Sequence, residues 1–265
     1  IELSGIVDVE FPPSLIAIDF SHNKITGFTE NTIRSMKNLI ALNVSFNEIE
    51  EIPDAFPSGE GEQFHLSKFF ADHNHLKSIP NSLLSSNSIE QFSVSFNNLH
   101  QIGQFRWPKL KSFNSSFNHL KELPDSFESS GLLQEVNFSF NDLSELPKSL
   151  SHCRKVSSLI ASGNKFICVP HCVMAFSQLK VLSLSGNKLT TLPKGFSSFF
   201  FLRFLDLSNN NFSVYPTQIS TIRSMWFLSF AHNCLSDLPF PADPSEEDLA
   251  SVQASSGGEK PNKPP

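Results

Sequence analysis

The sequence predicts a solenoid of α/β-type repeats, in which a concave parallel sheet of about ten short strands is joined by helix-poor convex arcs. The first observation behind this prediction is the stretch LKVLSLSGNKLTTLPKGF, residues 179–196, where apolar residues alternate before an asparagine. Alternation along a strand sends Leu182 and Leu184 to one face and Val181 to the other. This stretch therefore predicts one short strand followed by a return arc.

The asparagine that ends the strand is the second observation. The amide of Asn187 can both donate to and accept from the backbone of the next unit, which few side chains can do. The same residue recurs at spacings of 24, 27, 23, 21, 23, 23, 23, 23 and 23 residues. The predicted structural ladder comprises Asn23, Asn47, Asn74, Asn97, Asn118, Asn141, Asn164, Asn187, Asn210 and Asn233. Ten recurrences of one pattern predict a single elongated domain.

A proline follows the asparagine by six residues in eight of the ten units, within arcs of the form L-P-x-x-F/L. With this pattern the chain resembles the leucine-rich repeat superfamily over about residues 1–240, and its 23-residue units resemble the intracellular class. That class includes Ras-binding scaffolds, polarity adaptors, adenylyl cyclase repeats and repeat domains joined to protein phosphatase 2C. The resemblance implies a leucine-rich repeat horseshoe whose concave face binds a protein partner.

Residues 1–241 are expected to form the repeat domain, which starts with a truncated unit where Ile1 stands in place of the asparagine. An insertion between Pro53 and Leu66 predicts a solvated convex loop. Residues 242–254 carry helix-start signals and predict a short C-terminal capping helix, with disorder as the alternative. Residues 255–265 have the composition of a flexible linker.

Charge and hydropathy exclude some partners. The net charge is −6 and the isoelectric point is about 5.8. There is no basic stripe in the sequence, so this balance argues against a nucleic-acid or anionic-membrane partner. No apolar run reaches the ~18–20 residues that a membrane-spanning helix needs.

The four cysteines bear on the compartment. Cys153 and Cys172 align with buried apolar or small residues of other units, whereas Cys168 and Cys234 align with exposed polar ones. Without clustered cysteines at the ends of the solenoid, a reducing, cytoplasmic location is expected. Four N-glycosylation sequons begin at Asn43, Asn114, Asn137 and Asn211. A chain this rich in Asn and Ser contains about that many by chance, so they are not evidence for secretion.

No catalytic residue, metal site or cofactor is predicted. The segment Cys168–Cys172 includes His171, but its template positions differ from those of His152 and Cys153, so four zinc ligands would not converge. Four histidines are expected to be exposed loop residues: His73, His75, His100 and His119. No phosphate-binding glycine loop, nucleophile elbow or paired acid motif is present. A catalytic domain beyond these residues stays an open alternative.

The C-terminal third places apolar side chains where the pattern directs residues outward. The candidate protein-binding residues are Ile160, Val181, Phe201, Phe204, Trp226 and Phe227. Exposed apolar surface usually marks a contact site, and aromatic residues commonly anchor interfaces. The alternative is that the tail covers them. A second stripe consists of phenylalanines that directly precede ladder asparagines. Because they recur in register, their rings are predicted to stack between adjacent turns of the solenoid. They are Phe46, Phe96, Phe117 and Phe140.

These observations favour a cytosolic leucine-rich repeat module for protein–protein interaction, acting as a scaffold or adaptor in signalling. The first alternative is a regulatory or targeting domain of a larger enzyme, such as a serine/threonine phosphatase of the protein phosphatase 2C type. The second is an extracellular recognition receptor, which the cysteines disfavour. The identity of the partner and the oligomeric state are left open.

Overall fold

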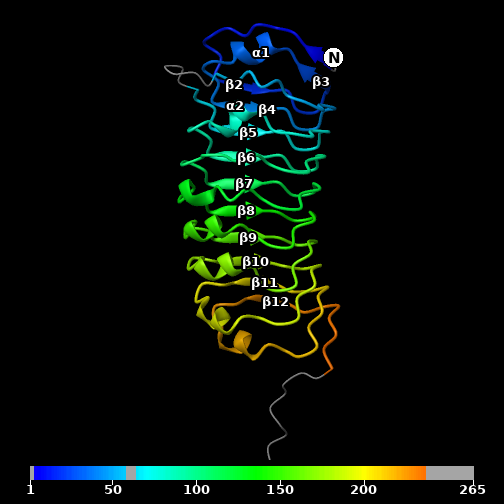
Figure 1. The fold of residues 1–265 in the computed structure, drawn as a ribbon, viewed down its shortest axis with the longest axis vertical. Helices are drawn as coiled ribbons and strands as arrows, with labels where there is room; N and C mark the ends of the chain where they lie inside the picture. Colours follow the sequence, from blue (N-terminus) through cyan, green and yellow to red (C-terminus); the bar gives the residue numbers. More distant parts are fainter. Residues whose placement is uncertain (1–2, 58–63, 237–265) are drawn as a thin grey trace, which may run out of the picture.

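The structure is a computed structural model that describes residues 3–57 and 64–236. Residues 58–63 of the insertion expected between Pro53 and Leu66, and the capping helix and linker expected at residues 242–265, lie outside the described residues. Within the described ranges the chain winds into a stack of similar turns, with one short strand in each turn (Figure 1).

Ten parallel strands form the concave sheet, in the order β12-β11-β10-β9-β8-β7-β6-β5-β4-β2. Each strand has three residues and pairs one-to-one with its neighbours, as Leu182 does with Leu159 and Leu205. The predicted fold is therefore confirmed. The strands are β2 (Ala17–Asp19), β4 (Ala41–Asn43), β5 (Lys68–Phe70), β6 (Gln91–Ser93), β7 (Ser112–Asn114), β8 (Glu135–Asn137), β9 (Ser158–Ile160), β10 (Val181–Ser183), β11 (Phe204–Asp206) and β12 (Phe227–Ser229).

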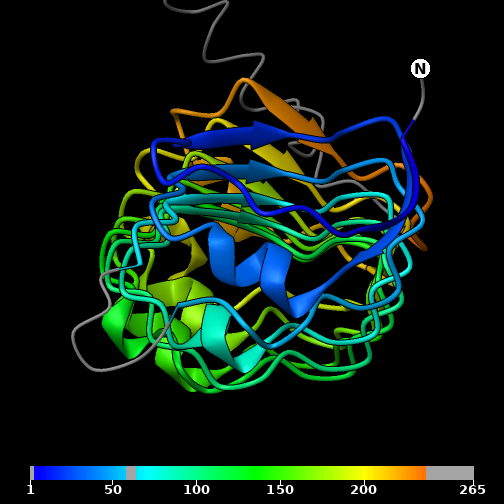
Figure 2. The same cartoon turned by 90° about the horizontal axis from the view of Figure 1, so that it is seen from above.

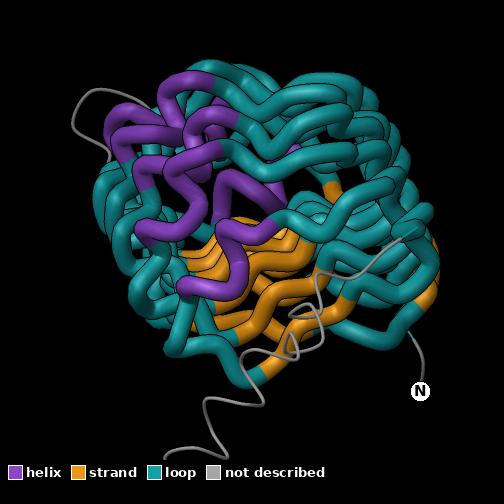
Figure 3. Tube along the Cα trace, turned by 90° about the horizontal axis from the view of Figure 1, so that it is seen from below, coloured by secondary structure: helices purple, strands orange, loops and turns teal. Residues whose placement is uncertain are grey.

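The return arcs carry only short helices, which gather on the side of the stack away from the strands (Figures 2 and 3). They are α1 (Glu30–Ser35), α2 (Asn81–Leu84) and the 3-10 helices η1 (Phe127–Ser129), η2 (Lys148–His152), η3 (His171–Ala175), η4 (Lys194–Ser198) and η5 (Thr217–Thr221). The recurring proline immediately precedes α2, η2, η3, η4 and η5, where its missing N–H costs no hydrogen bond. In the first unit Thr29 replaces that proline and caps α1 through its hydroxyl.

The first described residues form a separate two-stranded parallel sheet, in which β1 (Ser4–Val7) pairs with β3 (Lys24–Phe28). The N–H of Leu3 donates to Oδ1 of Asn23 at 2.8 Å. The N–H of Ile25, which stands two residues after Asn23, donates in the same way to Oδ1 of Asn47 at 3.0 Å. Leu3 therefore occupies the position two residues after a ladder asparagine. This agrees with the alignment of Ile1 with the ladder asparagines.

The core runs unbroken through the stack. The central side chain of every strand from β2 to β11 is buried, whereas Leu228 of β12 is partly exposed at the end of the stack. Phenylalanine replaces leucine in the middle of the core, where Phe69, Phe92 and Phe113 stack with ring centroids 5.5 and 5.6 Å apart. The fully buried Trp107 packs against Phe92 with ring centroids 4.6 Å apart, and its Nε1–H donates to the carbonyl of Leu83.

Candidate protein-binding surface

The asparagine ladder joins each turn to the turn before it. Oδ1 of Asn187 accepts from the N–H of Phe166 at 3.0 Å, and Nδ2 donates to the carbonyl of Ala161 at 3.1 Å. The prediction that this amide bonds the next unit was wrong. The N–H of Ala161 donates to the carbonyl of Ser183 in the following unit at 2.8 Å. The carbonyl of Ala161 and the N–H of Phe166, both in the preceding unit, are the backbone groups that the amide of Asn187 pairs.

The residue before each ladder asparagine has a left-handed backbone, with φ between 52° and 66° in all ten units. Four of these residues are phenylalanines, for which that conformation is uncommon. Their rings stack along the edge of the sheet, with His73 between Phe46 (4.3 Å) and Phe96 (4.1 Å). The column continues to Phe117 at 3.9 Å and to Phe140 at a further 4.3 Å. The predicted self-stacking is confirmed, and stacking offsets the backbone strain.

Gly163 ends this aromatic column. Its φ is +63°, and a Cβ at that position would lie 2.6 Å from Cδ1 of Phe140. Gly163→Ala is expected to lower the free energy of unfolding by about 1–2 kcal/mol, because alanine disfavours the left-handed region and the Phe140 ring must move. A denaturant titration measures this. Gly131→Ala is the control, since its added Cβ would meet nothing within 4 Å; equal midpoints for both variants would contradict the prediction.

At the C-terminal end of the sheet, aromatic side chains stand on the concave face. Phe204 of β11 and Phe227 of β12 are direct neighbours in the sheet, and their rings stack in parallel with centroids 4.4 Å apart. Phe227 is 45% exposed, Phe201 50% and Trp226 80%. The guanidinium carbon of Arg203 lies 4.8 Å from the centre of the Trp226 ring, which places a cation against an aromatic face.

Two of the candidate residues are less prominent. Val181 is half-buried and continues the row of Phe204 and Phe227 onto β10. Ile160 is also half-buried, but its neighbour on β10 is Ser183, so it lies two residues away from that row. We define the aromatic surface as Val181, Phe201, Phe204, Trp226 and Phe227.

The cysteines divide as the alignment predicts: Cys153 and Cys172 are buried, whereas Cys168 and Cys234 are exposed free thiols. Burial raises the pKa of both buried thiols to about 12. Because the thiolate is the reactive form, Cys168 and Cys234 should react quickly with a thiol reagent near pH 8, and the buried pair only on unfolding. Time-resolved mass spectrometry of the labelled protein checks this. Rapid labelling of all four would refute it.

Within residues 3–57 and 64–236, no group of three or more His, Cys, Asp or Glu side chains is placed to hold a metal ion. His73 belongs to the aromatic column, whereas the rings of His100 and His119 lie 5.3 Å apart. The same residues include no helix long and apolar enough to cross a membrane.

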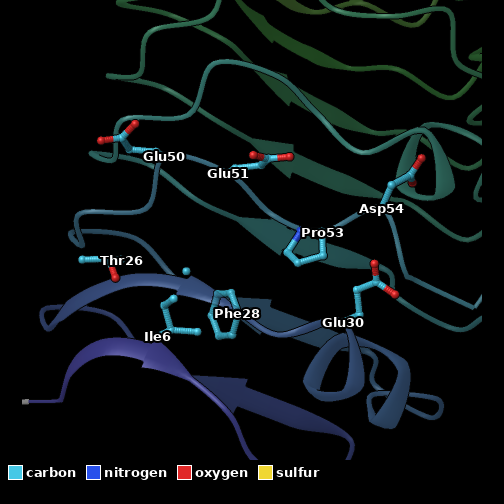
Figure 4. Close-up of a pocket in the computed structure, with 9 residues that line it drawn as sticks. Ile6, Thr26, Phe28, Glu30, Glu50, Glu51, Pro53 and Asp54 are labelled. Atoms are coloured by element: carbon cyan, nitrogen blue, oxygen red, sulfur yellow. The ribbon is translucent and has the colours of Figure 1, made fainter.

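A cavity of about 530 Å³ lies at the N-terminal end between β3 and the arc of the second unit (Figure 4). Its floor includes Phe28 and its walls carry Glu30, Glu50, Glu51 and Asp54. A hydrogen bond from Lys77 lowers the pKa of Glu50, and one from Ser82 lowers that of Asp54. Glu30 pairs with Arg34 and Glu50 with Lys77, so Glu51 and Asp54 are the carboxylates of this cavity without an ion pair among the described residues.

The opposite end is cationic. Residues 150–236 contain eight Lys and Arg and a single acidic residue, Asp206, whereas residues 1–149 contain ten basic and nineteen acidic ones. A net charge summed over the whole chain hides this separation. Counting charges unit by unit would have found it.

A second cavity, of about 240 Å³, lies in the cationic region on the rim where the chain enters β8, β9 and β10. We call it the basic notch. It is lined by Gln134, Lys155, Ser157, Gln178 and Lys180. Two ammonium groups and two amides offer hydrogen-bond donors, whereas the hydroxyl of Ser157 already donates to the carbonyl of Gln134 at 3.3 Å. No carboxylate lines the notch.

Comparison with known proteins agrees with the fold. A family model described as leucine rich repeat matches residues 170–212. The chain has the leucine-rich repeat fold. Pig (Sus scrofa) fibromodulin is 32% identical over 93 residues, which are 34% of this chain and 58% of that protein, so the match spans little more than half of the relative.

Solved structures share the architecture of this leucine-rich repeat protein at low sequence identity. The ectodomain of the plant membrane receptor kinase GASSHO1/SCHENGEN3 from Arabidopsis thaliana, in complex with CASPARIAN STRIP INTEGRITY FACTOR 2, has a TM-score of 0.72 at 23% identity. The match covers 88% of this chain and 29% of that one. A TDR receptor has a TM-score of 0.71 at 22% identity, covering 83% of this chain and 39% of that one.

Proposed function

We propose that this leucine-rich repeat protein is a protein-interaction module that binds its partner through the aromatic surface at the C-terminal end of the concave sheet. The observation that carries the proposal is the stacked pair Phe204 and Phe227, with Trp226 and Phe201 exposed beside it. These rings lie outside the repeat core, and burying them in an interface removes apolar area from water at about 25 cal/mol per Å². The ectodomain of the receptor kinase GASSHO1/SCHENGEN3, which has the same fold, was solved in complex with CASPARIAN STRIP INTEGRITY FACTOR 2.

The experiment is the double change Phe204→Ser with Phe227→Ser, tested by capture of partners from the protein's native cells. Loss of two anchor rings should weaken the captured partner's binding by about 2 kcal/mol or more. Unfolding should change little, by about 1 kcal/mol, because the variant loses one stacked pair of an exposed and a half-buried ring and no core side chain.

The matched control changes the same face at the other end of the sheet, Ala41→Ser with Asn43→Ser in β4. If the control weakens binding and the phenylalanine variant does not, the contact lies on the N-terminal units. If the phenylalanine variant unfolds far more easily than the control, these rings belong to the core and the proposal fails.

The proposal includes a cytosolic location and a scaffold or adaptor role in signalling, as in the intracellular repeat class. The free thiols of Cys168 and Cys234, both exposed, suit a reducing compartment. Intact mass and peptide mapping of protein from its native source test this. Recovery of a disulfide, or of a glycan at any of the four sequons, would place the protein outside the cytosol instead.

A further inference from the structure

From the basic notch and its neighbours we infer that the contacting segment of the partner is an acidic peptide, whose carboxylates enter the notch while an adjacent apolar side chain packs on the aromatic surface. This inference rests on the proposed function and adds the chemistry of the partner.

The notch and the aromatic surface lie on one continuous row. The N–H of Lys180 donates to the carbonyl of Ser157, that of Arg203 to the carbonyl of Lys180, and that of Trp226 to the carbonyl of Arg203, each at 2.8 Å. The N–H of Ser157 donates in the same way to the carbonyl of Gln134 at 2.9 Å. Lys180 and Trp226 are therefore two units apart. At about 4.8 Å between neighbouring strands this is about 10 Å, the length of about three extended residues. One short peptide can thus reach both places.

The cations of this row have no carboxylate of their own. Among the described residues, no ion pair involves Lys155, Lys180, Arg203 or Arg223, and Arg203 rests against Trp226. The donors of the notch match carboxylate oxygens, which accept several hydrogen bonds at once. Charge complementarity therefore selects an anionic occupant with an apolar anchor.

A peptide fits better than a nucleic acid. Single-stranded nucleic acids also combine phosphates with bases that stack on aromatic rings. However, the cationic region ends within about four units, and the nineteen acidic residues of residues 1–149 would repel a long polyanion that followed the sheet. A short acidic segment avoids that repulsion.

Trp226 provides the signal for a direct test, because the only other tryptophan, Trp107, is fully buried. The probe is a tryptophan-free peptide of twelve residues, in which Asp and Glu stand about three positions from a Phe–Leu pair. Added to the 265-residue chain, it should shift the Trp226 emission to the blue. Replacement of its Asp and Glu by Asn and Gln should weaken binding at least tenfold.

The matched protein variants reverse two charges each. Lys155→Glu with Lys180→Glu, inside the notch, should abolish the shift. Lys188→Glu with Lys194→Glu, two exposed lysines away from the notch, should leave it unchanged. Unfolding midpoints show that each variant is folded, and fluorescence anisotropy of a labelled probe confirms binding independently of Trp226.

Three results would overturn the inference: equal binding of the amide peptide, tighter binding of an oligothymidylate than of the acidic peptide, or binding of the peptide only after residues 237–265 are deleted. The last result would identify the acidic residues 243–248 of this chain, DPSEED, as the occupant. A partner lost by Phe204→Ser with Phe227→Ser but kept by Lys155→Glu with Lys180→Glu would leave the proposed function standing and remove only its acidic character.

Discussion

Asn187→Ala is expected to lower the free energy of unfolding by about 2–6 kcal/mol, at about 1–3 kcal/mol for each of two buried backbone groups that lose their partner. The N–H of Phe166 bonds Oδ1 of Asn187, and the carbonyl of Ala161 accepts from its Nδ2. Both hydrogen bonds are buried inside the stack. A denaturant titration followed by far-UV circular dichroism measures the loss.

The control for this variant is Lys188→Ala, one residue further along the same turn. The side chain of Lys188 is exposed, so its removal should shift the midpoint by no more than a typical surface substitution, about 0.5 kcal/mol. Equal midpoints for Asn187→Ala and Lys188→Ala would show that the asparagines do not hold the turns together.

Leu182→Ala is the second large effect, with an expected cost of about 2–5 kcal/mol. Leu182 is fully buried at the centre of β10, between Leu159 and Leu205 of the neighbouring strands. Truncation removes buried apolar area and leaves a cavity that the stacked turns above and below cannot close.

Val181→Ala tests the register of the same strand. Val181 faces outward and is half-buried, so its truncation should cost well under half as much as that of Leu182. Successive residues of a strand point to opposite faces, so a slip of one residue would exchange the two results. A larger loss for Val181→Ala than for Leu182→Ala would contradict the structure.

Much of the fold could be predicted from the sequence because each unit repeats the same physical solution. Leu182 and Leu184 alternate with outward residues, and an asparagine follows after the same interval in all ten units. The phenylalanines of the column occur in register, so their stacking followed from the fold. The stripe predicted from phenylalanine alone left out His22 and His73, which complete the column. Both stand in the same register, directly before Asn23 and Asn74, so the spacing carried this signal.

Other features depend on neighbours that are far apart in the chain. The direction in which Asn187 bonds is set by which backbone groups the sheet leaves unpaired, and this is visible only in three dimensions. The basic notch brings Gln134 and Lys180 together from units about 46 residues apart in sequence. The net charge of the whole chain adds the positive charges near the notch to the negative charges near the acidic cavity at the other end, so it reveals neither site. The outward positions of Phe204 and Phe227, by contrast, follow from the strand period alone.

Hydroxyl-radical footprinting of the chain, alone and with its captured partner, tests the central claim most directly. It reports the solvent exposure of individual aromatic side chains, so Phe46 and Phe140 of the aromatic column serve as internal references. Binding through the aromatic surface predicts that oxidation of Trp226, Phe201 and Phe227 falls several-fold while Phe46 and Phe140 react as before. Unchanged oxidation of Trp226 and Phe227, with protection confined to the aromatic column or to residues 26–54 beside the acidic cavity, would contradict it.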